Sequence, residues 1–354
     1  MADELIDALR SGDVARVRLA IERNPQAARH ARAIGEAAGL AFQAALELLV
    51  KHGADLNGTW RGYRPLHNLI QSTNHEAPGT PPAARLRCLE WMLEHGADPE
   101  QTGAWPPARA VIVAAFAGLP DFVKPMRKRN DAFAGAALAD RKLVEATLRR
   151  RPDFARERDI GGLTALQCAA GSRMAGPLVE LARLLIDAGA DIRAKTKSWS
   201  GDIDAVHLAA SAKNALLFEL LLVRGADATE ALSPALWNGT EDLAAISLAH
   251  GAVPDAARAD GQPLLNNLIR WGGFRQAMWL LTRGASPNVA DERGWTAVHQ
   301  AASRGNERML RAVLEAGGDA TRRDKEGCLP RDSATRDRIL AMLQGSSIKR
   351  GQVS

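Results

Sequence analysis

Residues 294–319 read GWTAVHQAASRGNERMLRAVLEAGGD and contain two short helical patterns. Gly294 opens a turn, and the first pattern carries His299 and the alanine pair Ala301–Ala302. The second pattern has apolar residues at helical spacing and ends at Gly317, where a helix favours a left-handed C-cap residue. The stretch therefore predicts a turn followed by two short helices.

The end of this unit recurs along the chain. Seven phrases place a glycine after a helical apolar pattern: VKHGADLN (50–57), LEHGADPE (93–100), IDAGADIR (186–193), LVRGADAT (222–229), LAHGAVPD (248–255), LTRGASPN (281–288) and LEAGGDAT (314–321). The glycines of the last three phrases, Gly251, Gly284 and Gly317, are 33 residues apart. A period of this length indicates stacked supersecondary units.

These phrases resemble the ankyrin repeat, whose unit runs turn glycine, T-P-L-H, A-A, then a second helix ending in L-L-x-x-G-A-D. The likeness is clearest at 294–319 and continues at 162–191, 205–227, 65–98 and 261–284. It implies an all-α solenoid of about eleven helix-turn-helix units with short β-turn fingers. We expect one solenoid over 1–345, with capping units at 1–30 and 327–345 and a disordered tail at 346–354.

Some spacings depart from the period. From Gly53 to Gly96 is 43 residues, and the excess lies in the Pro- and Gly-containing loop 73–83. A longer finger is expected around 197–202. From Gly225 to Gly251 is only 26 residues, which predicts that the finger before Leu232 is missing.

Composition limits the class of protein. Of the 354 residues 46% are hydrophobic but only 5% are aromatic, which is typical of close-packed helices. No apolar run is long enough for a membrane span. The acidic first residues and three widely spaced cysteines indicate a reducing, cytoplasmic location, and the Ala- and Arg-rich composition favours a bacterial source. The net charge is +5, and the basic residues are interspersed with acidic ones rather than clustered.

The histidines follow the repeat. His67, His207 and His299 share one position, where the resemblance implies an imidazole that ties neighbouring turns together. His52, His95 and His250 each precede a C-cap glycine, where a partly positive ring suits the helix end. Side chains that recur once per unit are scaffolding, so none is interpreted as catalytic.

The sequence offers no chemical motif. Phosphate loops, dinucleotide fingerprints, HExxH, GxSxG and CxxC are all absent from it. The carboxylate pairs Asp202/Asp204 and Asp291/Glu292 are interpreted as turn and helix caps. We predict no catalytic residue, no metal and no cofactor.

Tryptophan and arginine are the residue types that indicate a binding surface, because both are enriched in binding hot spots. The repeat places most of them on the fingers or at the ends of inner helices, which in ankyrin proteins line a concave groove. The predicted partner-binding residues are Trp60, Arg61, Tyr63, Trp105, Trp199, Trp237, Arg270, Trp271, Glu292, Arg293, Trp295 and Arg304. Trp91 and Trp279 are expected to pack on second helices.

Three classes of function remain open. The leading one is a monomeric, non-enzymatic scaffold that binds another protein, of unknown identity, through the groove. The second is binding of nucleic acid or another polyanion by the scattered arginines and tryptophans of the same groove, which would be strongly salt-dependent. The third is an enzyme with a cryptic site in the divergent 100–160 region. The sequence favours the first.

Overall fold

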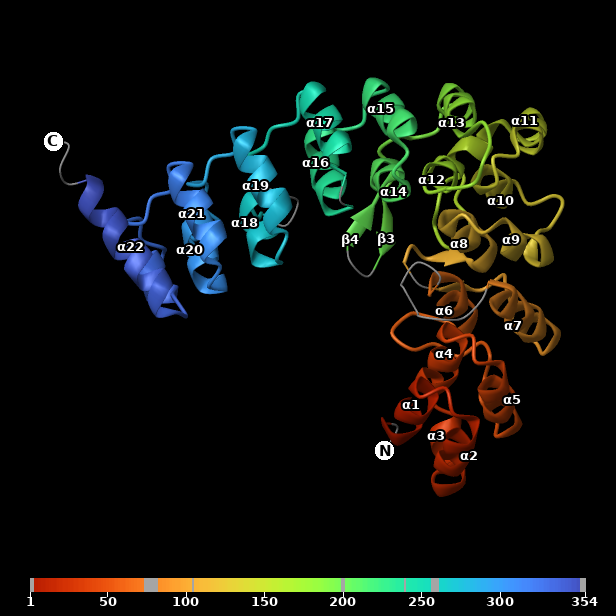
Figure 1. The fold of residues 1–354 in the computed structure, drawn as a ribbon. Coiled ribbons are helices and arrows are strands. Elements are labelled where there is room, and N and C mark those ends of the chain that lie inside the picture. Colours follow the sequence, from red (N-terminus) through yellow and green to blue (C-terminus); the bar gives the residue numbers. More distant parts are fainter. Residues whose placement is uncertain are drawn as a thin grey trace. The chain divides into compact units, whose positions relative to one another are not determined.

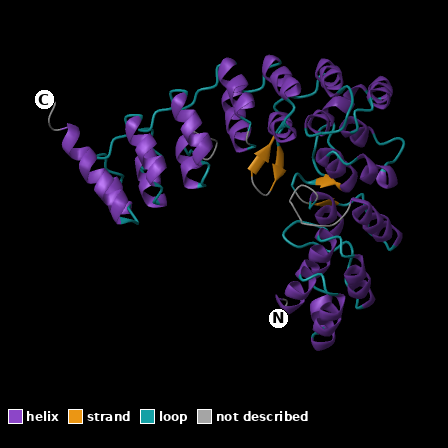
Figure 2. Cartoon of the chain, viewed as in Figure 1, coloured by secondary structure: helices purple, strands orange, loops and turns teal. Residues whose placement is uncertain are grey.

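The computed structural model describes residues 3–72, 82–103, 105–198, 201–238, 240–255 and 261–350, the last six of these by backbone alone. The chain divides into two compact units, 1–217 and 218–354, with the boundary inside one helix. Helices dominate both units, and the strands of the described residues form small two-stranded sheets (Figures 1 and 2). The expectation of one continuous solenoid over 1–345 remains a prediction.

The described part of the first unit consists of short helices and two strand pairs. Its elements are α1 (Asp3–Arg10), α2 (Val14–Arg23), α3 (Pro25–Ala28), α4 (Ala31–Gly39), α5 (Gln43–Lys51), α6 (Pro65–Gln71), α7 (Pro82–Glu94), β1 (Thr102–Gly103), β2 (Ala108–Arg109), α8 (Ala110–Ala117), α9 (Pro120–Met126), α10 (Ala132–Ala137), α11 (Arg141–Arg150), the 3₁₀-helix η1 (Pro152–Arg156), α12 (Ala165–Ala170), α13 (Leu178–Asp187), β3 (Thr196–Ser198), β4 (Gly201–Ile203) and α14 (Ala205–Ala212). The boundary falls within α15 (Ala215–Val223).

The second unit continues the same alternation. It contains α16 (Ala228–Trp237), α17 (Glu241–Ala249), α18 (Leu264–Arg270), α19 (Phe274–Thr282), α20 (Ala297–Arg304), α21 (Glu307–Glu315), the 3₁₀-helix η2 (Pro330–Ser333) and α22 (Asp337–Arg350). Helix α22 extends five residues into 346–354, where the sequence analysis expected a disordered tail.

The helices form antiparallel pairs, as the repeat predicted. Among the described residues, seven pairs, from α1/α2 to α14/α15, begin in the first unit, and four, from α16/α17 to η2/α22, lie in the second. We call the leading member of each pair the first helix and the other the second helix. Successive first helices such as α4, α6 and α8 pack on one another, with second helices beside them (Figure 1). Each pair thus buries its neighbour's apolar face.

Glycine ends the second helices as predicted. All seven C-cap glycines, Gly53, Gly96, Gly189, Gly225, Gly251, Gly284 and Gly317, have φ between 87° and 103°. A side chain would be strained in this left-handed region, so glycine at this position determines where the second helix of each repeat ends.

Alanine allows the first helices to approach closely. Both members of the pairs Ala169–Ala170, Ala209–Ala210 and Ala301–Ala302 are fully buried. Behind them leucine, isoleucine and valine of both helix layers fill the core, among them Leu46, Leu69, Leu185, Leu221 and Val313. The close-packed seam predicted from the A-A phrase is confirmed.

The departures from the period also have structural counterparts. Helix α16 begins three residues after Gly225, with Asp227 as its N-cap, so the finger is missing as predicted. Of the extra residues around 197–202, the described ones belong to the paired strands β3 and β4. Most of the predicted 73–83 loop lies outside the described residues, and α7 begins at Pro82.

Candidate functional site

The fingers are the turns that precede the first helices, and aspartates shape three of them. The Asp291 carboxylate accepts hydrogen bonds from the backbone N–H groups of Arg293 and Trp295, both at 2.9 Å. Asp159 and Asp324 hold their turns in the same way. Such side chain–backbone bonds fix a turn locally. Asp291 therefore caps a turn, as the sequence analysis expected.

Asp204 has the predicted helix-capping role. It is the N-cap of α14 and accepts hydrogen bonds from the backbone and ring nitrogens of His207, both at 2.9 Å. Burial raises the pKa of the Asp204 carboxyl, but the hydrogen bond and charge of His207 outweigh it, and the net pKa is lowered. The carboxylate form therefore dominates at neutral pH.

Four further histidines contact the backbone, as the repeat implied. His67 donates from Nε2 to the Ala108 carbonyl at 2.8 Å, and His299 accepts from the Thr296 N–H at 3.2 Å. At helix C-termini His52 and His95 donate from Nδ1 to the carbonyls of Leu48 and Trp91 at 2.8 Å. These rings satisfy backbone groups at turns and helix ends.

The finger at 58–64 presents the first predicted binding residues. Trp60 and Tyr63 form a two-residue bridge, with reciprocal backbone hydrogen bonds of 3.0 Å. Trp60 is 38% exposed. Its ring and that of His30 form an edge-on contact with centroids 4.9 Å apart, and the Arg61 guanidinium lies 5.7 Å from the Trp60 ring centroid. Trp60 and Arg61 are thus accessible side chains on a rigid turn.

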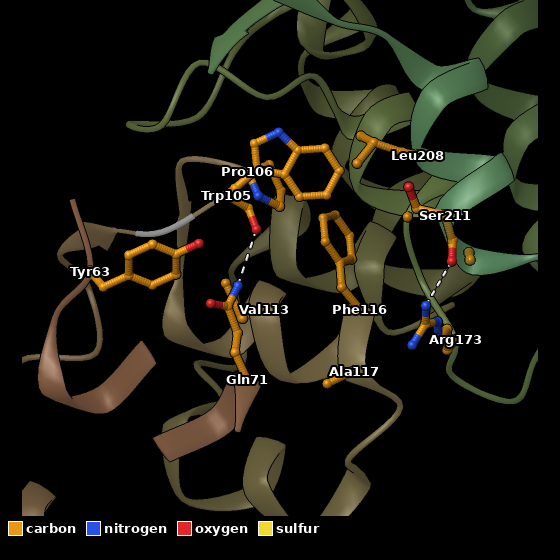
Figure 3. Close-up of a pocket in the computed structure, with 12 residues that line it drawn as sticks. Tyr63, Gln71, Trp105, Pro106, Val113, Phe116, Ala117, Arg173, Leu208 and Ser211 are labelled. Atoms are coloured by element: carbon orange, nitrogen blue, oxygen red, sulfur yellow. Dashed lines mark hydrogen bonds between the residues drawn. The ribbon is translucent and has the colours of Figure 1, made fainter. Parts of the chain in front are cut away.

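Trp105 lies in a cavity of about 250 Å³ within the first unit (Figure 3). It is half-buried, which differs from the exposed position expected of a finger tryptophan, and its backbone carbonyl accepts from Gln71 Nε2 at 3.1 Å. The lining brings together residues of two fingers and the first helices α6, α8 and α14, and includes Tyr63, Gln71, Trp105, Phe116, Arg173 and Leu208.

Phe116 and Arg173 also line this cavity, although the sequence pattern did not predict either as a site residue. The Phe116 ring fits because a Cβ on Gly171 would lie 2.6 Å from it. Arg173 donates to the Ser211 carbonyl at 2.7 Å. The contacts join helices more than 30 residues apart, and the repeat pattern gave no signal for them.

Trp295 has a structural role. The indole N–H donates to the Asp324 carboxylate at 3.0 Å, and Arg293 covers the ring at 4.5 Å. The ring also stacks near His299. This half-buried side chain links two fingers 29 residues apart, so it carries structural contacts whether or not it also touches a partner.

Trp271 and Trp237 are more accessible. Trp271 follows α18 and is 67% exposed, with Arg270 lying 5.5 Å from its centroid, whereas Trp237 is 37% exposed. Arg304 and Glu292 are exposed in the same unit. Trp91 and Trp279 are half-buried on α7 and α19, in line with the packing expected of second helices.

The predicted binding residues therefore fall into two groups. Trp60, Arg61, Tyr63 and Trp105 belong to the first unit, whereas Trp237, Arg270, Trp271, Glu292, Arg293, Trp295 and Arg304 belong to the second. Trp199 lies outside the described residues. Each group has its own candidate surface.

The described residues hold no cluster of three or more His, Cys, Asp or Glu side chains suited to a metal ion. Cys88 and Cys168 are buried and free, and burial raises the pKa of both thiols, that of Cys88 to about 12. Cys328 is exposed. Within the same residues no helix is both long and apolar enough to span a bilayer.

Models of known protein families match two parts of the chain. Residues 267–314 match a model described as ankyrin repeats (many copies), and residues 161–197 match the ankyrin repeat model. The chain is an ankyrin-repeat protein. Ankyrin repeats generally mediate protein–protein interaction, and the family is typically a non-enzymatic scaffold.

Individual relatives share only parts of the chain. An ankyrin repeat-containing protein of Schizosaccharomyces pombe is 46% identical over 50 residues, which are 14% of this chain and 24% of that protein. The B-cell lymphoma 3 protein homolog of Mus musculus is 25% identical over 182 residues, 48% of this chain and 40% of that protein. The chain thus matches less than half the length of these curated relatives.

Two solved structures are similar to the ankyrin chain. The human ASB11 ankyrin repeat domain has a TM-score of 0.49 and 19% identity, covering 62% of this chain and 98% of that one. An ankyrin repeat domain from Acinetobacter baumannii has a TM-score of 0.44 and 27% identity, covering 53% and 98%.

Proposed function

We propose that this ankyrin protein binds a partner protein through its finger faces, by which we mean the fingers and the ends of the first helices within each unit. The observation that carries the proposal is the exposure of Trp60, Trp237 and Trp271 at these ends. Tryptophan loses much apolar area from water when a partner covers it, and it is enriched in binding hot spots.

The scaffold beneath these residues supports binding by preformed surfaces. The finger of Trp60 is held by reciprocal backbone hydrogen bonds, and those of Asp159, Asp291 and Asp324 by carboxylate caps. A preorganised surface loses little conformational entropy when the partner binds. The partner then binds to side chains that are already in position.

Site-specific photo-crosslinking tests the proposal. A photo-reactive amino acid replaces Trp60 or Trp271 on the finger faces, and Leu19 of α2 or Arg311 of α21 as second-helix controls, all four of which are exposed. We expect the finger-face positions to crosslink to the same protein in cells of the source organism, and the controls to yield none of that adduct. Equal adducts at all four positions, or adducts at the controls alone, would overturn the proposal.

A further inference from the structure

Within the second unit, cationic and aromatic side chains gather at the ends of the first helices. We define the arginine–tryptophan surface as Trp237, Arg270, Trp271, Arg304 and Arg336. A Cβ on Gly273 would lie 3.5 Å from the Trp237 ring, and one on Gly272 would lie 3.9 Å from Arg304 Nη2. These contacts connect the turn after α18 with α16 and with the end of α20.

The surface is hollowed at its Arg336 end. A depression of about 380 Å³ is lined by Phe274, Arg304, Gly305, Asn306, Glu307 and Arg336. Arg336 lies against the left-handed cap of α20, since a Cβ on Gly305 would be 3.1 Å from its Nε. Two guanidinium groups thus border one depression.

The arginines of this surface are not engaged in ion pairs with other described residues. Arg270, Arg304 and Arg336 are all exposed and have no ion-pair partner among the described residues. Glu307, the one acid in the lining, lies 3.7 Å from Arg338, whereas the neighbouring Asp337 is exposed.

Helix stability explains only part of this pattern. Arg270 and Arg304 end α18 and α20, where a cation suits the helix dipole, an effect worth about 0.3–1 kcal/mol. Arg336 instead precedes α22, where a positive charge opposes the dipole of that helix. The 67% exposure of Trp271 has no stabilising counterpart, since exposed apolar area gains nothing from folding.

Building on the proposed function, we infer that the arginine–tryptophan surface binds an acidic segment of the partner protein. Carboxylates of the segment pair with Arg304 and Arg336, because a guanidinium binds a carboxylate through parallel hydrogen bonds. An apolar side chain of the segment covers Trp271, which Arg270 holds in place by a cation–π contact. Three unpaired arginines with acids beside them suit a short acidic segment better than a nucleic-acid backbone, which usually engages more cations.

The test uses the full chain and three labelled probes. The first is a short peptide in which glutamates flank two leucines, the second replaces those glutamates by glutamines, and the third is oligothymidylate with the charge of the first. The variant Arg304→Glu/Arg336→Glu is compared with Arg308→Glu/Arg311→Glu, which makes the same charge change at exposed positions of α21.

We expect the acidic peptide to bind the wild type, with affinity falling about tenfold or more in the first variant and less than about twofold in the control. Trp271→Ala should also weaken it while circular dichroism stays unchanged. Equal loss in both charge variants, tighter binding of oligothymidylate, or equal binding of the glutamine peptide would overturn the inference. If that occurs while Trp60 and Trp271 still crosslink to one partner, the proposed function stands and only the acidic chemistry fails.

Discussion

The Nε2 atom of His67 lies 2.8 Å from the carbonyl oxygen of Ala108, which is 41 residues further along the chain. A carbonyl accepts only, so Nε2 carries a proton and donates this hydrogen bond. Burial lowers the pKa of His67 to about 4. One imidazole thus joins α6 to the hairpin β1–β2 that precedes α8.

This histidine should make the fold sensitive to acid. Its ordinary pKa is 6.5, so below pH 6.5 the unfolded chain takes up a proton that the folded chain resists until about pH 4. The stability contributed by neutral His67 is therefore present above pH 6.5 and lost as the pH falls towards 4. Urea unfolding at a series of pH values should show this loss in the wild type and a smaller one in His67→Gln.

Another repeat of this chain already carries glutamine at the position of His67. Gln167, at the same repeat position, donates to the carbonyls of Ala194 and Ile203 at 3.0 and 3.1 Å. His67→Ala should cost about 1–3 kcal/mol at pH 7, since the Ala108 carbonyl loses its donor. An equal slope of stability against pH in wild type and His67→Gln would show that other groups cause the acid sensitivity.

Gly161 is expected to tolerate no side chain. A Cβ there would lie 1.8 Å from the Pro107 carbonyl oxygen, so the fingers must separate to admit it. Gly161→Ala should therefore lower the free energy of unfolding by about 1–3 kcal/mol. Gly39→Ala, at the end of α4, meets Asn68 only at ordinary contact distance and should be neutral or stabilising. Similar denaturation midpoints for the two variants would contradict this account.

The alanine seam should resist larger side chains. Ala301 is fully buried between first helices, and Ala301→Leu is expected to cost about 1–3 kcal/mol by overpacking. Ala316→Leu adds the same volume at an exposed C-cap and serves as the control. Thermal unfolding measures both, and an unchanged midpoint in Ala301→Leu would mean that the seam is loosely packed.

Arg109 should be the ion-pair residue on which the first unit depends most. It is buried, pairs with Asp131 and Glu100, and lies 3.9 Å from Asp159. Burial lowers the pKa of Arg109, but the hydrogen bond and charge of Asp131, with the nearby acids, outweigh burial. The net pKa is raised, so the guanidinium stays protonated. Arg109→Met removes the ion-pair partner of Asp131, whose side chain is only 12% exposed, and should cost about 3–5 kcal/mol.

A surface pair provides the comparison. Arg23 and Glu4 lie 2.7 Å apart, but both side chains are 60% exposed. Arg23→Met should therefore change stability by about 0–1 kcal/mol, because water already screens this pair. Equal losses for Arg109→Met and Arg23→Met in guanidinium titrations would refute the distinction.

The sequence predicts the scaffold well because the scaffold repeats. Each C-cap glycine is required by backbone geometry, so its spacing marks the units without knowledge of tertiary contacts. Trp271 and Trp295 show where this reasoning ends. Both stand near the ends of repeat elements, but Trp295 is half-buried by its contact with Asp324, whereas Trp271 is exposed. Such differences depend on residues in the next unit, and a repeat pattern does not encode them.

Hydrogen exchange of the complex with the crosslinked partner tests the central claim most directly. We predict that amides of the fingers at 58–64 and 290–296, and at the ends of α18 and α20, exchange more slowly when the partner is bound. Amides of the second helices α5, α13 and α21 should exchange as in the free protein. Slowing confined to those second helices, with the fingers unchanged, would contradict the claim that this protein binds through its finger faces.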